Sequence, residues 1–383
     1  MIHPHVLKAE DIQAYTHRIM KTHFEIEAHG YTCTTDMIYD ILLKASAECS
    51  SLEAACADLE EVADSNTVRE YVNQALPSQS LGQQEEQSNQ ALANCIPVSM
   101  ARQGIEMAID FHDEPFYGKQ ADLRAVTCGG QAKKGTAHFV RIATAYVIWR
   151  QVRLTLAVHY VLPEEKALTV LKILLERLKN LNFEAKVLYL DKGFAASPIV
   201  AYLTSTHQPA IIANPIRGKT GGTRALCQGR SSYKTLHTFG SGIQVTLALK
   251  ASLVPDKTGK RRRKWLAFIV ILLDWSVEKI FQEHRRRFGV ECSYRLLRRV
   301  RATTTSRNPA MRFFLLSVGL ILTNAWVFLR WEFARLLATG PRRVDEARLR
   351  FHRFRKLLIR SIENHYGTIS AIPTHQSPHS VIY

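Results

Sequence analysis

The spacing of apolar residues changes along the chain. In residues 1–76 apolar side chains recur every three or four positions, as at Ile38, Ile41 and Leu42, which predicts helices throughout. From Gly104 onward, short alternating runs that are typical of strands occur between helical segments, and after about residue 270 the helical spacing returns. The pattern predicts an α/β protein with an all-helical domain at residues 1–76.

Residues 104–216 contain strands and helices in an informative order. Apolar runs predict strands at residues 105–111, 139–149, 152–160, 185–190 and 210–213, with helices at 163–181 and from Ser197. Three strands, a helix, a strand, a helix and a strand is the order of an RNase H-like core, a mixed sheet flanked by helices. Ligands of such sheets bind at the carboxyl ends of the strands, where Asp110 and Asp191 are expected.

The remaining segments differ in composition. Residues 77–103 are polar and are expected to form a linker, residues 217–270 a β-rich insertion, residues 271–340 the remaining core helices, and residues 341–383 a basic C-terminal tail. Residues 51–59 and 65–76 are spaced as in a helix-turn-helix, although any helical hairpin has the same pattern. The pattern leaves open whether residues 51–76 read DNA.

Positive charge is concentrated after the first hundred residues. Residues 1–100 hold 5 Lys and Arg against 15 Asp and Glu, a net charge of −10, whereas the whole chain has +17. Residues 101–383 therefore have a net charge of +27, which indicates a nucleic-acid partner or an anionic membrane surface. The seven cysteines include no C-x-x-C pair, which argues against a zinc site or a disulfide framework and favours a reducing cytoplasm.

One segment has the apolar character of a membrane span. Residues 313–329 form a run of 17, shorter than the roughly 20 residues that cross a bilayer. The run also includes Ser317, Thr323 and Asn324, and arginines flank it on both sides. We expect it to be the central helix of a soluble core, and a membrane protein built around this helix is the alternative.

The strongest chemical signal lies in residues 284–301, where one carboxylate, Glu291, stands among arginines. On a helix, the side chains seven and four positions before it, and three, four and seven after it, lie on its face. Those side chains are His284, Arg287, Tyr294, Arg295 and Arg298. An ordinary salt-bridge ladder has the same spacing, so the pattern gains weight only if other carboxylates lie near Glu291.

Two aspartates at predicted strand ends are the candidates to join that carboxylate. Asp110 is the last residue of the largely apolar run IEMAID at residues 105–110, and Asp191 directly follows the run AKVLYL at residues 185–190. Asp113 and Glu114, which lie beyond in the predicted loop, are the alternatives to Asp110, and a simple turn residue is the alternative role of Asp191. Several carboxylates at one site suit Mg2+, which prefers oxygen ligands.

With Asp110, Asp191 and Glu291 in this order, 81 and 100 residues apart, residues 104–335 resemble the DDE-type transposases of prokaryotic insertion sequences. The resemblance rests on AIDFHDEPFYG around the first aspartate, LYLDKGF around the second, and RATTTSRNPAMR before the apolar helix. The segment around the glutamate is similar to the Tyr-x2-Arg-x3-Glu-x6-Lys helix of one group of these enzymes.

This segment departs from the group's motif at two positions. Arg287 and Glu291 stand where the motif has Arg and Glu, but His284 stands in place of Tyr and Arg298 in place of Lys. Both changes keep a polar or cationic side chain. They also favour the alternative that the protein is a catalytically inactive DNA-binding protein derived from a transposase.

The resemblance implies an enzyme that cleaves DNA at the ends of its own insertion sequence and transfers the freed strands to target DNA. Asp110, Asp191 and Glu291 would be its catalytic residues and the ligands of two Mg2+ ions, for which Mn2+ substitutes. Cationic side chains are expected to hold the DNA backbone. They are His284, Arg287, Arg295, Arg298, Lys260, Arg261, Arg262, Arg263 and Lys264.

The resemblance also implies partners and a location. The partners are double-stranded DNA, as terminal inverted repeats and target, and a second copy of the chain bound to the same DNA. The location is the cytoplasm of a prokaryote, at the nucleoid and away from the membrane.

Overall fold

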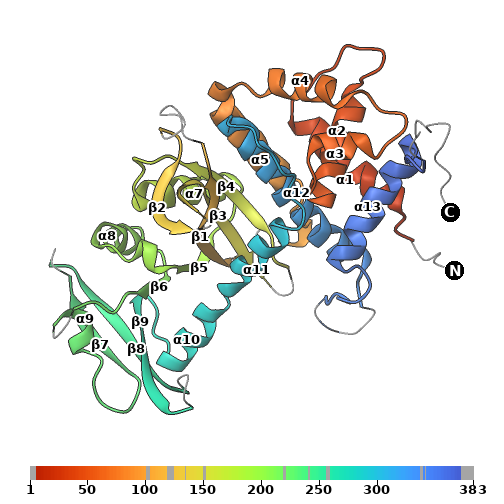
Figure 1. Cartoon of the computed structure of the whole chain (residues 1–383). Helices are drawn as coiled ribbons and strands as arrows, with labels where there is room; N and C mark the ends of the chain where they lie inside the picture. The colour runs from red at the N-terminus through yellow and green to blue at the C-terminus, as the bar shows by residue number, and fades with distance from the viewer. Residues whose placement is uncertain are drawn as a thin grey trace.

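The computed structural model describes residues 6–371, apart from residues 101–103, 119–124, 134, 150–151, 219–220, 240–241, 256–258, 337–339 and 341. Figure 1 shows two parts, one made of helices from both ends of the chain and one built around a sheet. Helices α5 and α12 lie between the two parts (Figure 1). The protein is thus a mixed α/β structure.

A single mixed sheet of nine strands forms the centre of the second part. Its order is β2-β3-β1-β5-β6-β9-β8-β7, and β4 pairs with β3. β5 runs parallel to both β1 and β6, and the other pairs are antiparallel. The strands are β1 Ile105–Phe116, β2 Cys128–Lys133, β3 Thr136–Ile148, β4 Thr155–Val161, β5 Ala185–Leu190, β6 Ala210–Asn214, β7 Tyr233–Thr238, β8 Gln244–Pro255 and β9 Arg261–Ile271.

β1 is longer than the sequence predicts. It continues past Asp110 to Phe116 because its antiparallel partner β3 pairs with it as far as Phe116 and His138. The expectation that this strand ends at Asp110 was therefore wrong. The parallel partner β5 does end there, since its last paired residue, Leu190, lies opposite Ile109.

The segment at residues 217–270 is not a separate insertion in space. Its three strands extend the main sheet, because β9 pairs antiparallel with β6. The pairing runs from Ala210 opposite Ile271 to Asn214 opposite Ala267. β8 and β7 continue the sheet outward from β9. The expected β-rich piece is present, and it forms one edge of the sheet.

Among the described residues, six further helices, from α7 to α12, lie between the sheet strands in the chain or after the last of them. α7 and α8 each bury one apolar face, with buried residues three or four positions apart, as helices that cover a sheet require. α8 begins with Pro198 in its first turn, where proline is favoured. The helices are α7 Ala167–Asn180, α8 Ser197–Ser205, α9 Gly222–Ala225, α10 Val277–Arg285, α11 Phe288–Leu297 and α12 Pro309–Phe333.

The N-terminal residues form the predicted helices, namely α1 Ala9–His23, α2 Thr35–Glu48, α3 Leu52–Ala57 and α4 Ser65–Ala75. α3 has only six residues, and seven residues separate its end from the start of α4. A helix-turn-helix has a turn of about three or four residues. The connection between α3 and α4 does not match that motif.

Residues 77–103 do not form an open linker. They contain α5 Leu81–Ala93, whose polar side chains pair with the free edge of β4. Asn89 accepts a hydrogen bond from the backbone N–H of Val158 and donates one to its carbonyl, both at 2.9 Å. The glutamines and glutamates that make the segment look like a linker also favour a helix, and here they cover a strand edge.

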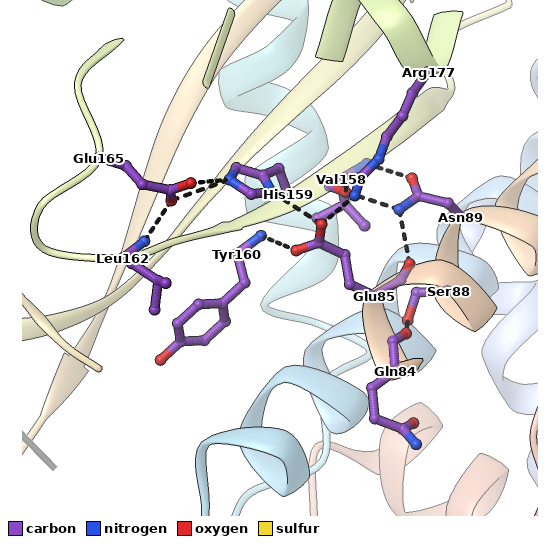
Figure 2. Close-up of polar contacts among 10 residues, drawn as sticks. All are labelled: Gln84, Glu85, Ser88, Asn89, Val158, His159, Tyr160, Leu162, Glu165 and Arg177. Carbon is purple, nitrogen blue, oxygen red and sulfur yellow. Dashed lines mark hydrogen bonds and ion pairs between the residues drawn. The ribbon is translucent and has the colours of Figure 1, made fainter. Parts of the chain in front are cut away.

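Figure 2 shows the buried polar network beside that edge, with His159 between Glu85 of α5 and Glu165. His159 Nδ1 lies 2.9 Å from Glu85 Oε1, and Nε2 lies 3.1 Å from Glu165. Glu85 also accepts a hydrogen bond from the Tyr160 N–H at 2.6 Å and pairs with Arg177 (Figure 2). This network fixes α5 to the sheet.

The C-terminal segment is not a tail along its whole length. α13 Phe351–Tyr366 buries Phe354, Leu358 and Ile362, whose four-residue spacing forms one apolar face. It packs against α1 and α2, and the Tyr366 hydroxyl lies 3.1 Å from Asp40. Arginines on its other face made this helix look like a basic tail.

α12 is the one helix of the described residues that is long and apolar enough to cross a membrane, with a mean hydropathy of 1.7. The protein buries 89% of that apolar window. The side-chain amide of Asn324 accepts a hydrogen bond from the Thr155 N–H at 3.0 Å and donates one to the Thr155 carbonyl at 2.7 Å. These features are those expected of a core helix.

Candidate active site

Asp110 and Asp191 meet at the point where parallel pairing between their strands stops. Ile109 and Leu190 are the last residues of β1 and β5 that pair with each other, and the aspartates follow them directly. The Asp110 side chain is 13% exposed and that of Asp191 is 33% exposed. The two predicted aspartates therefore lie on neighbouring strands of one sheet.

Glu291 comes to this site from α11. Arg286 and Arg287 lie between α10 and α11, and both have right-handed helical backbone angles, so the segment stays close to the helical spacing used in the sequence analysis. These two arginines pair with different carboxylates. Arg286 contacts Glu106 and Glu283, both at 2.6 Å, and Arg287 points to the two aspartates.

Arg287 brings all three predicted carboxylates together. Its Nη1 lies 2.6 Å from Asp110 Oδ2, and its Nη2 lies 3.6 Å from Asp191 Oδ1 and 3.7 Å from Glu291 Oε1. The guanidinium was expected on the surface as a phosphate contact, but the arginine side chain is only 8% exposed. We call these four residues the carboxylate cluster.

Burial and charge both act on Asp110. Burial raises the pKa of its carboxyl to about 6, the Arg287 charge lowers it, and the charges of Asp191 and Glu291 raise it further. The charges act on Asp110 because Arg287, Asp191 and Glu291 lie close to it. A perturbed carboxyl in such a cluster is typical of functional sites.

Carboxylate oxygens are the donors that Mg2+ prefers, so the chemistry of the donor set fits a divalent cation. Within the described ranges, however, no three His, Cys, Asp or Glu side chains are grouped closely enough to hold a metal ion. In the carboxylate cluster the guanidinium of Arg287 occupies the space between the acids.

His284 has a different place from the one expected. Its side chain is buried, and Nε2 lies 3.1 Å from the carbonyl oxygen of Leu190, the residue before Asp191. Burial lowers the pKa of His284 to about 4. The imidazole, which packs against Phe268, is therefore part of the support for the end of β5 and not of a DNA-binding surface.

Tyr294 supports the other aspartate. Its hydroxyl lies 2.6 Å from Thr144 Oγ1 and 3.3 Å from the carbonyl oxygen of Asp110. The ring also stacks on His112 with centroids 4.3 Å apart. The sequence placed Tyr294 on the face of Glu291, but its partners come from distant strands and gave no local signal.

The two alternatives to Asp110 are engaged elsewhere. Asp113 pairs with Arg141 through contacts of 2.7 and 3.2 Å. Although burial opposes ionisation, hydrogen bonding from His112 and the charge of Arg301 lower the pKa of Glu114 to about 2. Neither carboxylate is among the contacts of Arg287.

The other predicted DNA contacts are at the surface. Arg295 and Arg298 are exposed on and just after α11. The five residues 260–264 are exposed at the start of β9, and Arg263 donates to the Gly229 carbonyl at 2.9 Å. These side chains form two cationic surfaces, one on α11 and one on β9.

The chain was compared with known proteins at the levels of sequence and structure. No family model matches it, and no curated protein matches it. Among solved structures it is similar to a piggyBac transposase in a synaptic complex with hairpin DNA, determined by cryo-EM. The TM-score is 0.58 at 10% sequence identity, over 95% of this chain and 79% of that chain. The protein therefore has the fold of a transposase.

Proposed function

We propose that this protein is a DDE-type transposase that cuts DNA at the ends of its own insertion sequence and joins the freed strands to target DNA. The observation that carries the proposal is the carboxylate cluster. Asp110 and Asp191 from neighbouring strands and Glu291 from α11 all face Arg287. The fold shared with a transposase supports the same function.

We infer that the sheet is an RNase H-like core. In support, β4, β3 and β1 are antiparallel neighbours, and β5 and β6 continue the sheet in parallel with β1. The two aspartates follow the last paired residues of β1 and β5, at the sheet edge where ligands of such sheets bind. β7 to β9 would then be an extension of this core.

Asp110, Asp191 and Glu291 would hold two Mg2+ ions, or Mn2+ in their place. Such ions activate the attacking oxygen and stabilise the leaving oxygen when a phosphodiester is displaced. The chain's own residues prepare the site, because His284 holds the end of β5 and Tyr294 holds the backbone of Asp110. Both supports come from the segment that carries the glutamate.

Double-stranded DNA is the proposed substrate. The exposed Arg295 and Arg298, and the exposed residues 260–264, supply positive charge that suits a phosphate backbone. Transposition requires two element ends to be held together while they are joined to target DNA, so the proposal includes a homodimer on DNA, in the cytoplasm of a prokaryote.

A second candidate is an inactive DNA-binding protein of the same fold. The observation that favours it is Arg287, which lies between carboxylates where a cation would have to bind.

Incubation of the purified protein with DNA from immediately outside its own gene separates the two candidates. The transposase predicts site-specific nicks with 3′-OH ends in Mg2+ or Mn2+ and none in chelator. Tight binding without nicks in either metal would favour the inactive protein.

A further inference from the structure

Arg287 is held by charge more than by directed hydrogen bonds. Only its contact with Asp110, at 2.6 Å, has hydrogen-bond length, whereas its contacts with Asp191 and Glu291 are 3.6 and 3.7 Å. Its Nε is buried and has no hydrogen-bond partner. An incompletely satisfied buried group of this kind needs an explanation, and a functional one is common.

A neighbouring pair provides a comparison. Arg141 holds Asp113 through both Nε and Nη2, at 2.7 and 3.2 Å, which is the two-pronged geometry of a stable arginine–carboxylate pair. Arg287 does not form such a pair with any of its three carboxylates. Its guanidinium is instead shared among them.

The charge of the carboxylate cluster is also unbalanced. Three ionised carboxylates face one guanidinium, so about two negative charges remain without a counter-ion in the cluster. The cluster is accessible on one side, since Glu291 is 43% exposed and Asp191 is 33% exposed, against 13% for Asp110. A cation from solvent would reach Glu291 and Asp191 first.

We propose that Arg287 is a resident counter-ion of the carboxylate cluster, and that a divalent cation binds there only as the guanidinium moves away from Asp191 and Glu291. The inference rests on the proposed function. In the metal-free protein Arg287 keeps the three acids together against their mutual repulsion. It also competes with the cation, so that removing its charge strengthens cation binding.

The test is the affinity of the full chain for Mn2+ without DNA, measured from the electron paramagnetic resonance signal of free Mn2+. Arg287→Gln is expected to bind Mn2+ about tenfold more tightly than wild type, the size of a typical coupling between two sites. Without metal, the same variant is expected to melt at a lower temperature, and Mn2+ is expected to raise that temperature more than in wild type.

Arg286→Gln is the matched control. Arg286 is the preceding residue and also contacts two carboxylates, Glu106 and Glu283, but none of the cluster. It is expected to leave Mn2+ affinity unchanged. Asp191→Asn is expected to weaken Mn2+ binding strongly, which assigns the measured ion to this site.

Arg287→Lys replaces Arg287→Gln if the latter does not fold. Lysine keeps the charge but lacks the fork of donors, so the Mn2+ affinity of Arg287→Lys is expected to lie between that of wild type and a value tenfold higher.

The possible failures are distinct. Equal or weaker Mn2+ binding by the Arg287 variant, together with loss of binding in Asp191→Asn, overturns the counter-ion role and leaves the proposed metal site intact. Absence of Mn2+ binding in every variant overturns both.

Discussion

Asp110 of β1 and Asp191, which follows β5, each come one residue after Ile109 and Leu190, the last residues that pair between these two parallel strands. Eighty-one positions separate them in the chain, and the strand register alone brings them to the same edge of the sheet. Because the register is set by buried apolar pairs before the aspartates, the geometry of the candidate site depends on the core.

We expect His284 to act through the fold and not through DNA. His284→Phe keeps an aromatic ring but leaves the Leu190 carbonyl without its 3.1 Å partner, which should cost about 1–2 kcal/mol of stability. Denaturant unfolding should detect this loss, and DNA cleavage should fall while DNA affinity in a gel-shift assay stays the same.

The control for that variant is Arg298→Gln, which changes an exposed side chain after α11. It should weaken DNA binding and leave the unfolding free energy within about 0.5 kcal/mol. Weaker DNA binding by His284→Phe at unchanged stability would mean that the sequence-based interpretation of this residue was right.

The exposed cationic surface at the start of β9 should contact DNA phosphates. The double variant Arg261→Gln, Lys264→Gln should bind all DNA sequences more weakly and reduce the slope of log affinity against log salt by about 2. Lys179→Gln, an exposed change on α7, is the control and should leave the slope unaltered. An unchanged slope in the double variant would exclude this surface from the interface.

Asn324 should be a major determinant of how α12 docks on the sheet. Asn324→Leu leaves both the N–H and the carbonyl of Thr155 without their partners, and we expect a loss of about 2–3 kcal/mol in denaturant unfolding. Ser317 lies in the same helix with a buried hydroxyl that has no hydrogen-bond partner. Ser317→Ala should therefore be neutral or stabilising, and a larger loss from it than from Asn324→Leu would contradict this account.

The network around His159 should make stability depend on pH. Burial lowers the pKa of His159, but the carboxylates of Glu85 and Glu165 outweigh burial, and its pKa is raised above the ordinary value of 6.5. A raised pKa means that the folded protein binds the proton more tightly than the unfolded chain. The stabilisation of the folded protein by protonated His159 is complete below about pH 6.5, and it is lost as pH rises through the raised pKa of His159.

His159→Gln removes this titration. The stability advantage of wild type over the variant should therefore be full below about pH 6.5 and shrink as pH rises above it in denaturant unfolding. An advantage that grows with pH would show that the imidazole is not held as a cation between Glu85 and Glu165.

Local patterns were enough to predict several parts of the fold. The strand before Asp191 was predicted with its observed bounds, and the helix predicted from Ser197 begins there, because apolar runs and proline act within a few residues. The choice of Asp110 over Asp113 rested on a strand end at Asp110, whereas both residues lie within β1, so the assignment of Asp110 to the site stays a prediction.

Other features depend on partners that are distant in the chain. α5 looked like a linker because its glutamates and glutamines are polar. Glu85 and Asn89 lie on the side of α5 that faces the sheet because they form hydrogen bonds with the free edge of β4. Arg287 contacts Asp110 and Asp191, which lie about 177 and 96 positions earlier in the chain, so local spacing gave no sign that its side chain is buried among carboxylates. α13 was missed although its apolar spacing is regular, since its arginines dominated the composition.

The central claim is that Asp110, Asp191 and Glu291 act together in DNA cleavage. The most direct measurement is the rate of metal-dependent nicking by Asp110→Asn, Asp191→Asn and Glu291→Gln on DNA from immediately outside the gene, with DNA binding measured in parallel. Asp113→Asn, which loses only the pair with Arg141, is the control. We predict that each of the three variants loses nicking by at least about a hundredfold and still binds DNA, whereas the control cuts. Near-normal nicking by any of the three would contradict the assignment of that residue to the site.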